Sequence, residues 1–179
     1  MAHFAVIAIG ADRPGIVAGL AGGLYEQGAN LEDVSSSILR GHFAIMLVVD
    51  AAEGSTAEGL RASLARATEP LGVSVEVRDV EAGALRRVHA SHALVAYGAD
   101  RPGIVAGLAG ILAERGANVT DLSCRLTGGD REDPEVYVLV AEVALPEGLD
   151  ADRLRGEIEA RGGELGVDVT FRAIDADTL

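Results

Sequence analysis

Two aspartates and two glycines stand at matching places in the chain and could together hold a small zwitterion. Asp12 and Gly15 belong to a stretch that reads GADRPGI, and Asp100 and Gly103 belong to its second copy. A helix is expected to begin in each stretch, and the free N–H groups at a helix N-terminus bind carboxylates. The glycines lack a Cβ, so a ligand can approach the backbone there. The neighbouring aspartate would then bind the ligand's ammonium group.

A simpler role is equally open for the same aspartates. Asp is a preferred N-cap residue, whose side chain accepts a hydrogen bond from the first helical turn. Pro14 has a fixed φ and no N–H, which suits a first turn, so the first helix is expected from about Pro14 to Gln27. Asp12 and Asp100 are therefore interpreted either as ligand-binding residues or as helix caps.

The other reactive residue types form no catalytic or metal-binding arrangement. Cys124 is the single thiol, and it stands at the repeat position of Ser36, on an apolar strand face that is typical of a small core residue. His89 and His92 lack Cys or carboxylate partners at metal-ligand spacing. No nucleophile–His–Asp set, phosphate-binding loop or dinucleotide fingerprint occurs. We expect no catalytic residue, no metal site and no cofactor, and we predict that the protein is not an enzyme.

The elements that must position these residues occur twice, because the chain is an internal duplication. Gly10–Asn30 returns as Gly98–Asn118, at an offset of 88 residues, and after Leu126 the offset is 94. The six extra residues of the second copy fall in the acidic, turn-rich stretch Gly129–Pro134. Insertions of this kind are typical of exposed loops, so we predict a mobile loop outside the ligand sites.

Each copy has the hydrophobic pattern of a strand, a helix, two strands, a helix and a strand. Val34, Ser36 and Ile38 alternate with polar residues, which predicts a half-buried second strand. This order predicts an α+β fold of two ferredoxin-like βαββαβ units, each with an antiparallel sheet and both helices on one face. The expected organisation is a first domain at 1–80, a linker at 81–90 and a second domain at 91–179.

Glycines inside the predicted helices need an explanation, because each costs roughly 1 kcal/mol relative to Ala. Close packing within the domain is the favoured explanation, and contact with a neighbouring module is the alternative. The glycines concerned are Gly19, Gly22 and Gly23 in the first helix and Gly107 and Gly110 in its copy.

The composition describes an acidic globular protein. Hydrophobic residues make up 49% of the chain, yet no apolar run approaches the roughly 18 residues that span a bilayer. The single cysteine and the lack of a visible signal peptide predict a cytoplasmic location. The net charge is −13 and the basic residues are all Arg, without a basic patch. Direct binding to nucleic acid or to an anionic membrane is therefore not expected.

The motif D-R-P-G-I, followed by a helix and G-A-N, resembles the ACT domain, in two copies that cover nearly the whole chain. ACT domains are ferredoxin-like modules that bind amino acids and regulate the proteins that carry them. The resemblance implies that the effector lies where two modules meet and touches the turn after the first strand and the start of the second strand. Carried onto this chain, the expected ligand-binding residues are Asp12, Pro14, Gly15, Ile16 and Asn30 for the first site, and Asp100, Pro102, Gly103, Ile104 and Asn118 for the second. Many ACT domains have Asn where this chain has Asp12 and Asp100, so the identity of the amino acid stays open.

Two linked ACT units without a catalytic domain resemble the glycine cleavage system transcriptional repressor family. We interpret the chain as a non-catalytic sensor of a small amino acid that acts through a protein partner, with any transcriptional role indirect. The alternative is a stand-alone regulatory subunit of an amino-acid or one-carbon metabolism enzyme. The resemblance further implies that ACT modules pair side by side into one larger sheet, which leaves a homodimer open.

Overall fold

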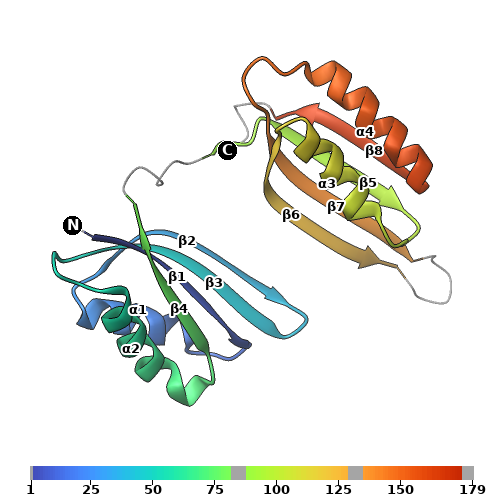
Figure 1. Ribbon diagram of the computed structural model, residues 1–179. Helices are drawn as coiled ribbons and strands as arrows, with labels where there is room; N and C mark the ends of the chain where they lie inside the picture. The colour runs from blue at the N-terminus through green and yellow to red at the C-terminus, as the bar shows by residue number, and fades with distance from the viewer. Residues whose placement is uncertain (1, 82–87, 129–134, 175–179) are drawn as a thin grey trace. The chain divides into compact units, whose positions relative to one another are not determined.

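The protein folds as two units that repeat one order of elements. The computed structural model describes residues 2–81, 88–128 and 135–174, and the chain divides into the two units after residue 86. Each unit carries two helices on one face of a four-stranded sheet (Figure 1). The acidic insertion predicted to be a loop, Gly129–Pro134, lies outside the described residues, as does most of the predicted linker.

The helices and strands follow the same sequence in both units. Unit 1 contains β1 (Ala2–Ala11), α1 (Ile16–Glu26), β2 (Asn30–Leu39), β3 (His42–Ala51), α2 (Ala57–Thr68), a short 3₁₀ turn (Glu69–Leu71) and β4 (Ser74–Val80). Unit 2 contains β5 (His92–Gly98), α3 (Ile104–Glu114), β6 (Asn118–Thr127), β7 (Val136–Ala144), α4 (Ala151–Leu165) and β8 (Val167–Ala173). The sheets are antiparallel, with strand orders β2-β3-β1-β4 and β6-β7-β5-β8. The predicted pair of βαββαβ units is therefore confirmed.

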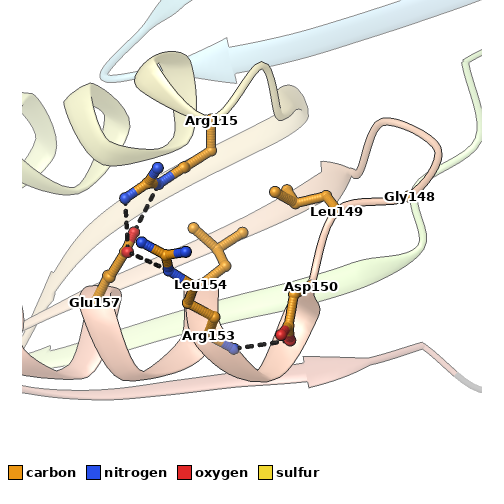
Figure 2. A pocket seen from close by; sticks show the side chains of 7 residues that line it. All are labelled: Arg115, Gly148, Leu149, Asp150, Arg153, Leu154 and Glu157. Carbon is orange, nitrogen blue, oxygen red and sulfur yellow. Dashed lines mark hydrogen bonds and ion pairs between the residues drawn. The ribbon is translucent and has the colours of Figure 1, made fainter.

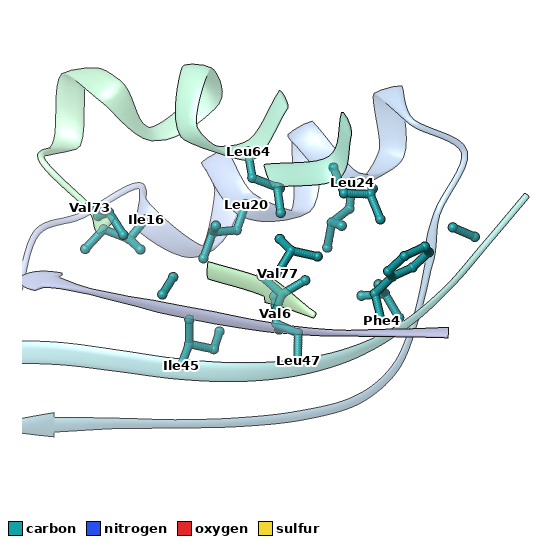
Figure 3. Packing of buried hydrophobic residues seen from close by; sticks show 14 of the residues in the cluster. Phe4, Val6, Ile16, Leu20, Leu24, Ile45, Leu47, Leu64, Val73 and Val77 are labelled. Carbon is teal, nitrogen blue, oxygen red and sulfur yellow. The ribbon is translucent and has the colours of Figure 1, made fainter. Parts of the chain in front are cut away.

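The core of each unit lies between the sheet and its helices. In unit 1, Phe4 and Val6 of β1 are fully buried and face Leu20 and Leu24 of α1 and Leu64 of α2 (Figure 3). The period of two along the strand and of about 3.6 along the helices brings these apolar side chains to one interface. Unit 2 repeats the arrangement with a core that includes Leu94, Ala96, Leu108, Leu112, Leu139, Leu154 and Ile158.

The prediction of a half-buried second strand is wrong for unit 1. All ten residues of β2 are exposed, and even Val34 and Ile38 are 49% and 59% exposed. β2 lies at the edge of the sheet and pairs only with β3, and none of the core residues of unit 1 comes from it. Alternation along a strand indicates which side chains share a face, but only the position of the helices decides whether that face is covered.

Close helix packing explains three of the five glycines in α1 and α3. A Cβ added at Gly23 would lie 3.1 Å from Leu64 Cδ2 and 3.2 Å from the Cβ of Ala67, both on α2. A Cβ at Gly107 would lie 2.9 Å from Leu165 Cδ1 on α4, and Gly19 faces the same layer in unit 1, 3.4 Å from a carbonyl of α2. These glycines let each pair of helices approach closely, which confirms the explanation by packing within the domain.

Gly22 and Gly110 have a different environment. No atom lies within 4 Å of a Cβ added at either position, among the residues that the structure describes. Because this space is open, packing inside the unit does not require glycine at either position. The two glycines occupy the same repeat position.

Candidate functional site

The turn between the first strand and the first helix ends in a left-handed glycine in both units. Gly15 has φ 101° and Gly103 has φ 100°, and these glycines are the N-caps of α1 and α3. Side chains with a Cβ rarely adopt this conformation, and it cannot continue a right-handed helix. The helix therefore begins at Ile16, two residues later than the start predicted at Pro14, and the same holds in unit 2.

Among the residues that the structure describes, no side chain caps α1 or α3, whereas α2 and α4 are both capped. The Oγ1 atom of Thr56 accepts a hydrogen bond from the N–H of Gly59 at 3.1 Å, and Asp150 caps α4 in the same manner. The interpretation of Asp12 and Asp100 as helix caps is therefore wrong. The first backbone N–H groups of α1 and α3 therefore have no capping side chain as acceptor. Free N–H groups at a helix N-terminus bind anions.

The aspartates stand three residues before these N-termini with exposed carboxylates. Within the described part of the chain, neither Asp12 nor Asp100 makes a side-chain hydrogen bond or ion pair. The backbone N–H of Asp12 donates to the carbonyl of Gly41 at 2.9 Å, which ties the turn to the β2–β3 hairpin. Arg40 and Gly41 have positive φ, as a two-residue type I′ hairpin requires. Each turn thus presents a negative side chain beside a positive helix end.

The proline and isoleucine of each turn have separate roles. Pro14 and Pro102 are exposed, whereas Ile16 and Ile104 are 2% and 1% exposed and belong to the hydrophobic cores. The isoleucine side chains therefore anchor the helix start and are unavailable to a ligand. Only their backbone N–H groups can take part in binding.

The asparagines lie at the other end of the sheet from the turns. Along β3, Phe43 pairs with Gly10 beside the turn, and Asp50 pairs with Asn30. Seven residues of extended strand correspond to about 23 Å. Asn118 opens β6 in the same way. An aspartate and an asparagine of one unit therefore cannot contact the same small ligand, so they do not form a site within one unit.

Unit 2 places a phenol and a thiol close to its turn. Tyr137 of β7 pairs with Gly98, the last residue of β5. Burial, a hydrogen bond with the Cys124 side chain and the negative charge of Asp100 raise the pKa of Tyr137 to about 12. The phenol is therefore protonated at neutral pH and can both donate and accept a hydrogen bond.

Tyr137 is a candidate site residue that the sequence analysis missed. Unit 1 has Phe43 at the position of Tyr137 and Ser36 at that of Cys124. Both cysteine and tyrosine side chains are half-buried and pack against the core of unit 2, in agreement with the reading of Cys124 as a small core residue. Aligning the two repeats would have shown this difference, but only the register places it next to the turn.

A hollow of about 240 Å³ lies at the start of α4 and is lined by an ion-pair network (Figure 2). Arg115 donates to both carboxylate oxygens of Glu157 at 2.8 and 2.6 Å, and Arg153 reaches the same carboxylate at 3.3 Å. The hydrogen bond from Arg115 is the largest of the effects that lower the pKa of Glu157. This network joins the end of α3 to α4. Unit 1 has Gln27, Gly59 and Ser63 at the corresponding positions.

The histidines and acids of the described residues do not form a metal centre. No group of three His, Cys, Asp or Glu side chains there could hold a metal ion. His92 instead stacks on Phe171, with ring centroids 4.9 Å apart, and burial lowers its pKa. None of the helices in the described part is long and apolar enough to cross a membrane.

Comparison with known proteins identifies both units. Models of the ACT domain match residues 3–78 and 92–153. A UPF0237 protein of Methanopyrus kandleri is 48% identical over 79 residues, which are 44% of this chain and 88% of that protein. A UPF0237 protein of Lactococcus lactis is 38% identical over 74 residues, 41% of this chain and 84% of that protein.

Two solved structures have the same fold over almost the whole chain. A protein of unknown function from Galdieria sulphuraria has a TM-score of 0.82 at 24% identity and covers 97% of this chain and 98% of its own. A candidate glycine cleavage system transcriptional repressor has a TM-score of 0.73 at 16% identity and covers 97% of both chains. The sequence motifs, the fold and these matches agree, and the chain belongs to the ACT-domain family, with two ACT domains in tandem.

Proposed function

We propose that this protein is a non-catalytic regulator that senses a small amino acid and acts through a protein partner. ACT domains imply regulatory binding of a small ligand. The observation that carries the proposal is the pair of uncapped helix N-termini, each behind a left-handed glycine and three residues after an unpaired aspartate. Because α2 and α4 of the same chain are capped by their own side chains, the uncapped ends are a specific feature of the two turns.

The two ends of an amino acid match the two charges of each turn. The α-carboxylate would accept hydrogen bonds from the first N–H groups of α1 or α3, where the helix dipole adds a partial positive charge. The ammonium group would donate to Asp12 or Asp100. A hydrogen bond between charged groups contributes about 1.5–3 kcal/mol, so loss of the aspartate lowers affinity roughly ten- to a hundredfold.

The asparagine in each site would come from a second ACT unit. Asn30 and Asn118 lie at the far ends of their own sheets, out of reach of their own turns. An amide side chain both donates and accepts, which suits the two ends of a zwitterion. A ligand held in this way stabilises the pairing of ACT units over their separation, and that shift would change the surface offered to a partner.

The partner is proposed to be a protein because the chain has a net charge of −13. Nucleic-acid surfaces carry concentrated positive charge, so an effect on transcription would be indirect. The likeness to a candidate glycine cleavage repressor is compatible with such a role, which would be tested by recovering the partner with and without the amino acid.

Thermal unfolding in the presence of each standard amino acid tests the proposal. One of them should raise the melting temperature, since a ligand at a hundred times its Kd adds about 2.7 kcal/mol of stability. The double variant Asp12→Ala/Asp100→Ala should fold and show a much smaller response, because its affinity is expected to be roughly ten- to a hundredfold lower. Thr56→Ala is the matched control, because it removes the cap of α2 at a cost of about 1 kcal/mol and leaves ligand affinity unchanged. If no standard amino acid stabilises the wild-type chain, the proposed function is wrong.

A further inference from the structure

We propose that Tyr137 contacts the ligand and makes the turn of unit 2 the tighter of the two amino-acid sites, by accepting a second hydrogen bond from the ligand's ammonium group. This inference rests on the proposed function and adds a difference between the two sites.

The backbone register brings Tyr137 to the turn. Tyr137 pairs with Gly98 on β5, and Asp100 follows two residues later. The phenol-bearing residue is therefore paired with the strand end from which the turn with Asp100 departs. Tyr137 is half-buried, and therefore retains some access to solvent beside the turn. On the side of β7 away from β5, Tyr137 pairs with Leu126 of β6.

The hydrogen-bonding capacity of these groups fits an ammonium ion. An ammonium group has three N–H donors and no acceptor, so one carboxylate leaves part of its capacity unused. The Tyr137 hydroxyl has two lone pairs. Cys124 stands two residues before Leu126, the β6 partner of Tyr137, so the thiol lies on the same face of the sheet as the phenol. The phenol oxygen can thus accept from a cation that Asp100 already attracts.

Unit 1 lacks this second acceptor. Phe43 stands at the place of Tyr137, pairs with Gly10 as Tyr137 pairs with Gly98, and is 6% exposed. A ligand ammonium at the turn of unit 1 would find the Asp12 carboxylate and no phenol. The two turns, identical in sequence, would therefore bind the same amino acid with different affinities.

Calorimetric titration of the intact chain tests the inference, with the standard amino acids as probes. Tyr137→Phe, which copies unit 1, should weaken one of two binding events about tenfold and leave the other unchanged. Tyr97→Phe is the matched control, because Tyr97 is 49% exposed and pairs with Val138, on the opposite face of the sheet from Tyr137. Equal affinities in the wild type and in Tyr137→Phe would overturn the inference while the proposed function stands. Absence of any binding to the wild type would overturn both.

A second measurement does not depend on how well Tyr137→Phe folds. The chain has three tyrosines and no tryptophan, so the variant Tyr25→Phe/Tyr97→Phe keeps Tyr137 as its single near-ultraviolet chromophore other than phenylalanine. Saturation with the amino acid that binds should change the near-ultraviolet absorbance of this variant. The N-acetylated form of that amino acid, which lacks the ammonium group, should leave the absorbance unchanged. An unchanged spectrum at saturation would overturn the contact with Tyr137.

Discussion

The two ACT units share their turns and differ in the layer behind them. The turn glycines have φ of 101° and 100°. Within the described residues, both helices lack a side-chain cap, and neither aspartate makes a side-chain hydrogen bond or ion pair. Behind the turns, Gly23 of unit 1 corresponds to Ile111 of unit 2, and Gln27 corresponds to Arg115. The two units therefore keep the same backbone conformation at their turns while the side chains between their helices differ.

The helix pairs show this divergence most clearly. In unit 1 a glycine lets α1 approach α2, so that an added Cβ would touch Leu64 and Ala67. In unit 2 an isoleucine fills the same repeat position, and Arg115 reaches Glu157 with two short hydrogen bonds. Both pairs approach closely at the Gly19 and Gly107 position, and they differ one turn later, where unit 1 has a second close contact at Gly23 and unit 2 has Ile111 with an ion pair nearby.

The largest effect is expected when this packing difference is erased. Gly23→Ile, which copies unit 2, should destabilise unit 1 by about 3 kcal/mol, because it forces extra methyl groups into a packed contact. Amide hydrogen exchange should show faster exchange in β1 and unchanged exchange in β5. Gly22→Ile is the control, since its Cβ would point into open space. Equal stability of both variants would show that α1 and α2 can separate without cost.

The shared turns should respond alike to loss of their glycines. Gly15→Ala and Gly103→Ala each place a Cβ on a residue with φ near 100°, which costs about 1–3 kcal/mol. Denaturant unfolding should report similar losses for the two variants, because at neither position does a nearby side chain add a steric clash. A much smaller loss in one unit would mean that its turn can relax, and the equivalence of the turns would fail.

The helical glycines with open space around an added Cβ should give a smaller effect of opposite sign. Gly22→Ala and Gly110→Ala are each expected to stabilise the chain by up to about 1 kcal/mol, because Ala favours the helix and meets no neighbour. Thermal unfolding of the free chain measures this gain. If either change lowers ligand affinity or alters the oligomeric state, the glycine belongs to a surface that contacts another module.

The smallest effect concerns pH and separates the units at a core position. Unit 1 has the fully buried Phe4 where unit 2 has His92, whose pKa is lowered by burial. Since the unfolded histidine titrates near 6.5, the unfolded state gains a proton first as pH falls, and unit 2 loses stability below that value. Above it, this contribution to stability is fully present. His92→Phe should reduce the drop in melting temperature between pH 8 and about pH 5. If the melting temperature falls equally with pH in the variant and the wild type, His92 takes up a proton as readily in the folded state as in the unfolded state.

Periodicity and repetition in the sequence were sufficient for the topology. The offset of the copies, the near-continuous apolar run from His3 to Ile9 and the helical spacing of Leu20 and Leu24 predict two βαββαβ units, as found. These signals are local, because side-chain direction follows directly from the strand and helix periods. The turns were readable in position but not in detail, because the fixed φ of proline suggested a helix start at Pro14, whereas the left-handed Gly15 delays the start to Ile16.

The sequence by itself determined the repeated fold, the turns and the charged groups that belong to them. Only the tertiary structure decided which of these groups meet. Strand register puts Asn30 at the opposite end of the sheet from Asp12 and pairs Tyr137 with Gly98, two residues before Asp100. It also leaves β2 uncovered, despite its alternating pattern. Pairing between strands joins residues that are far apart in the chain, and no local pattern of residue types specifies that pairing.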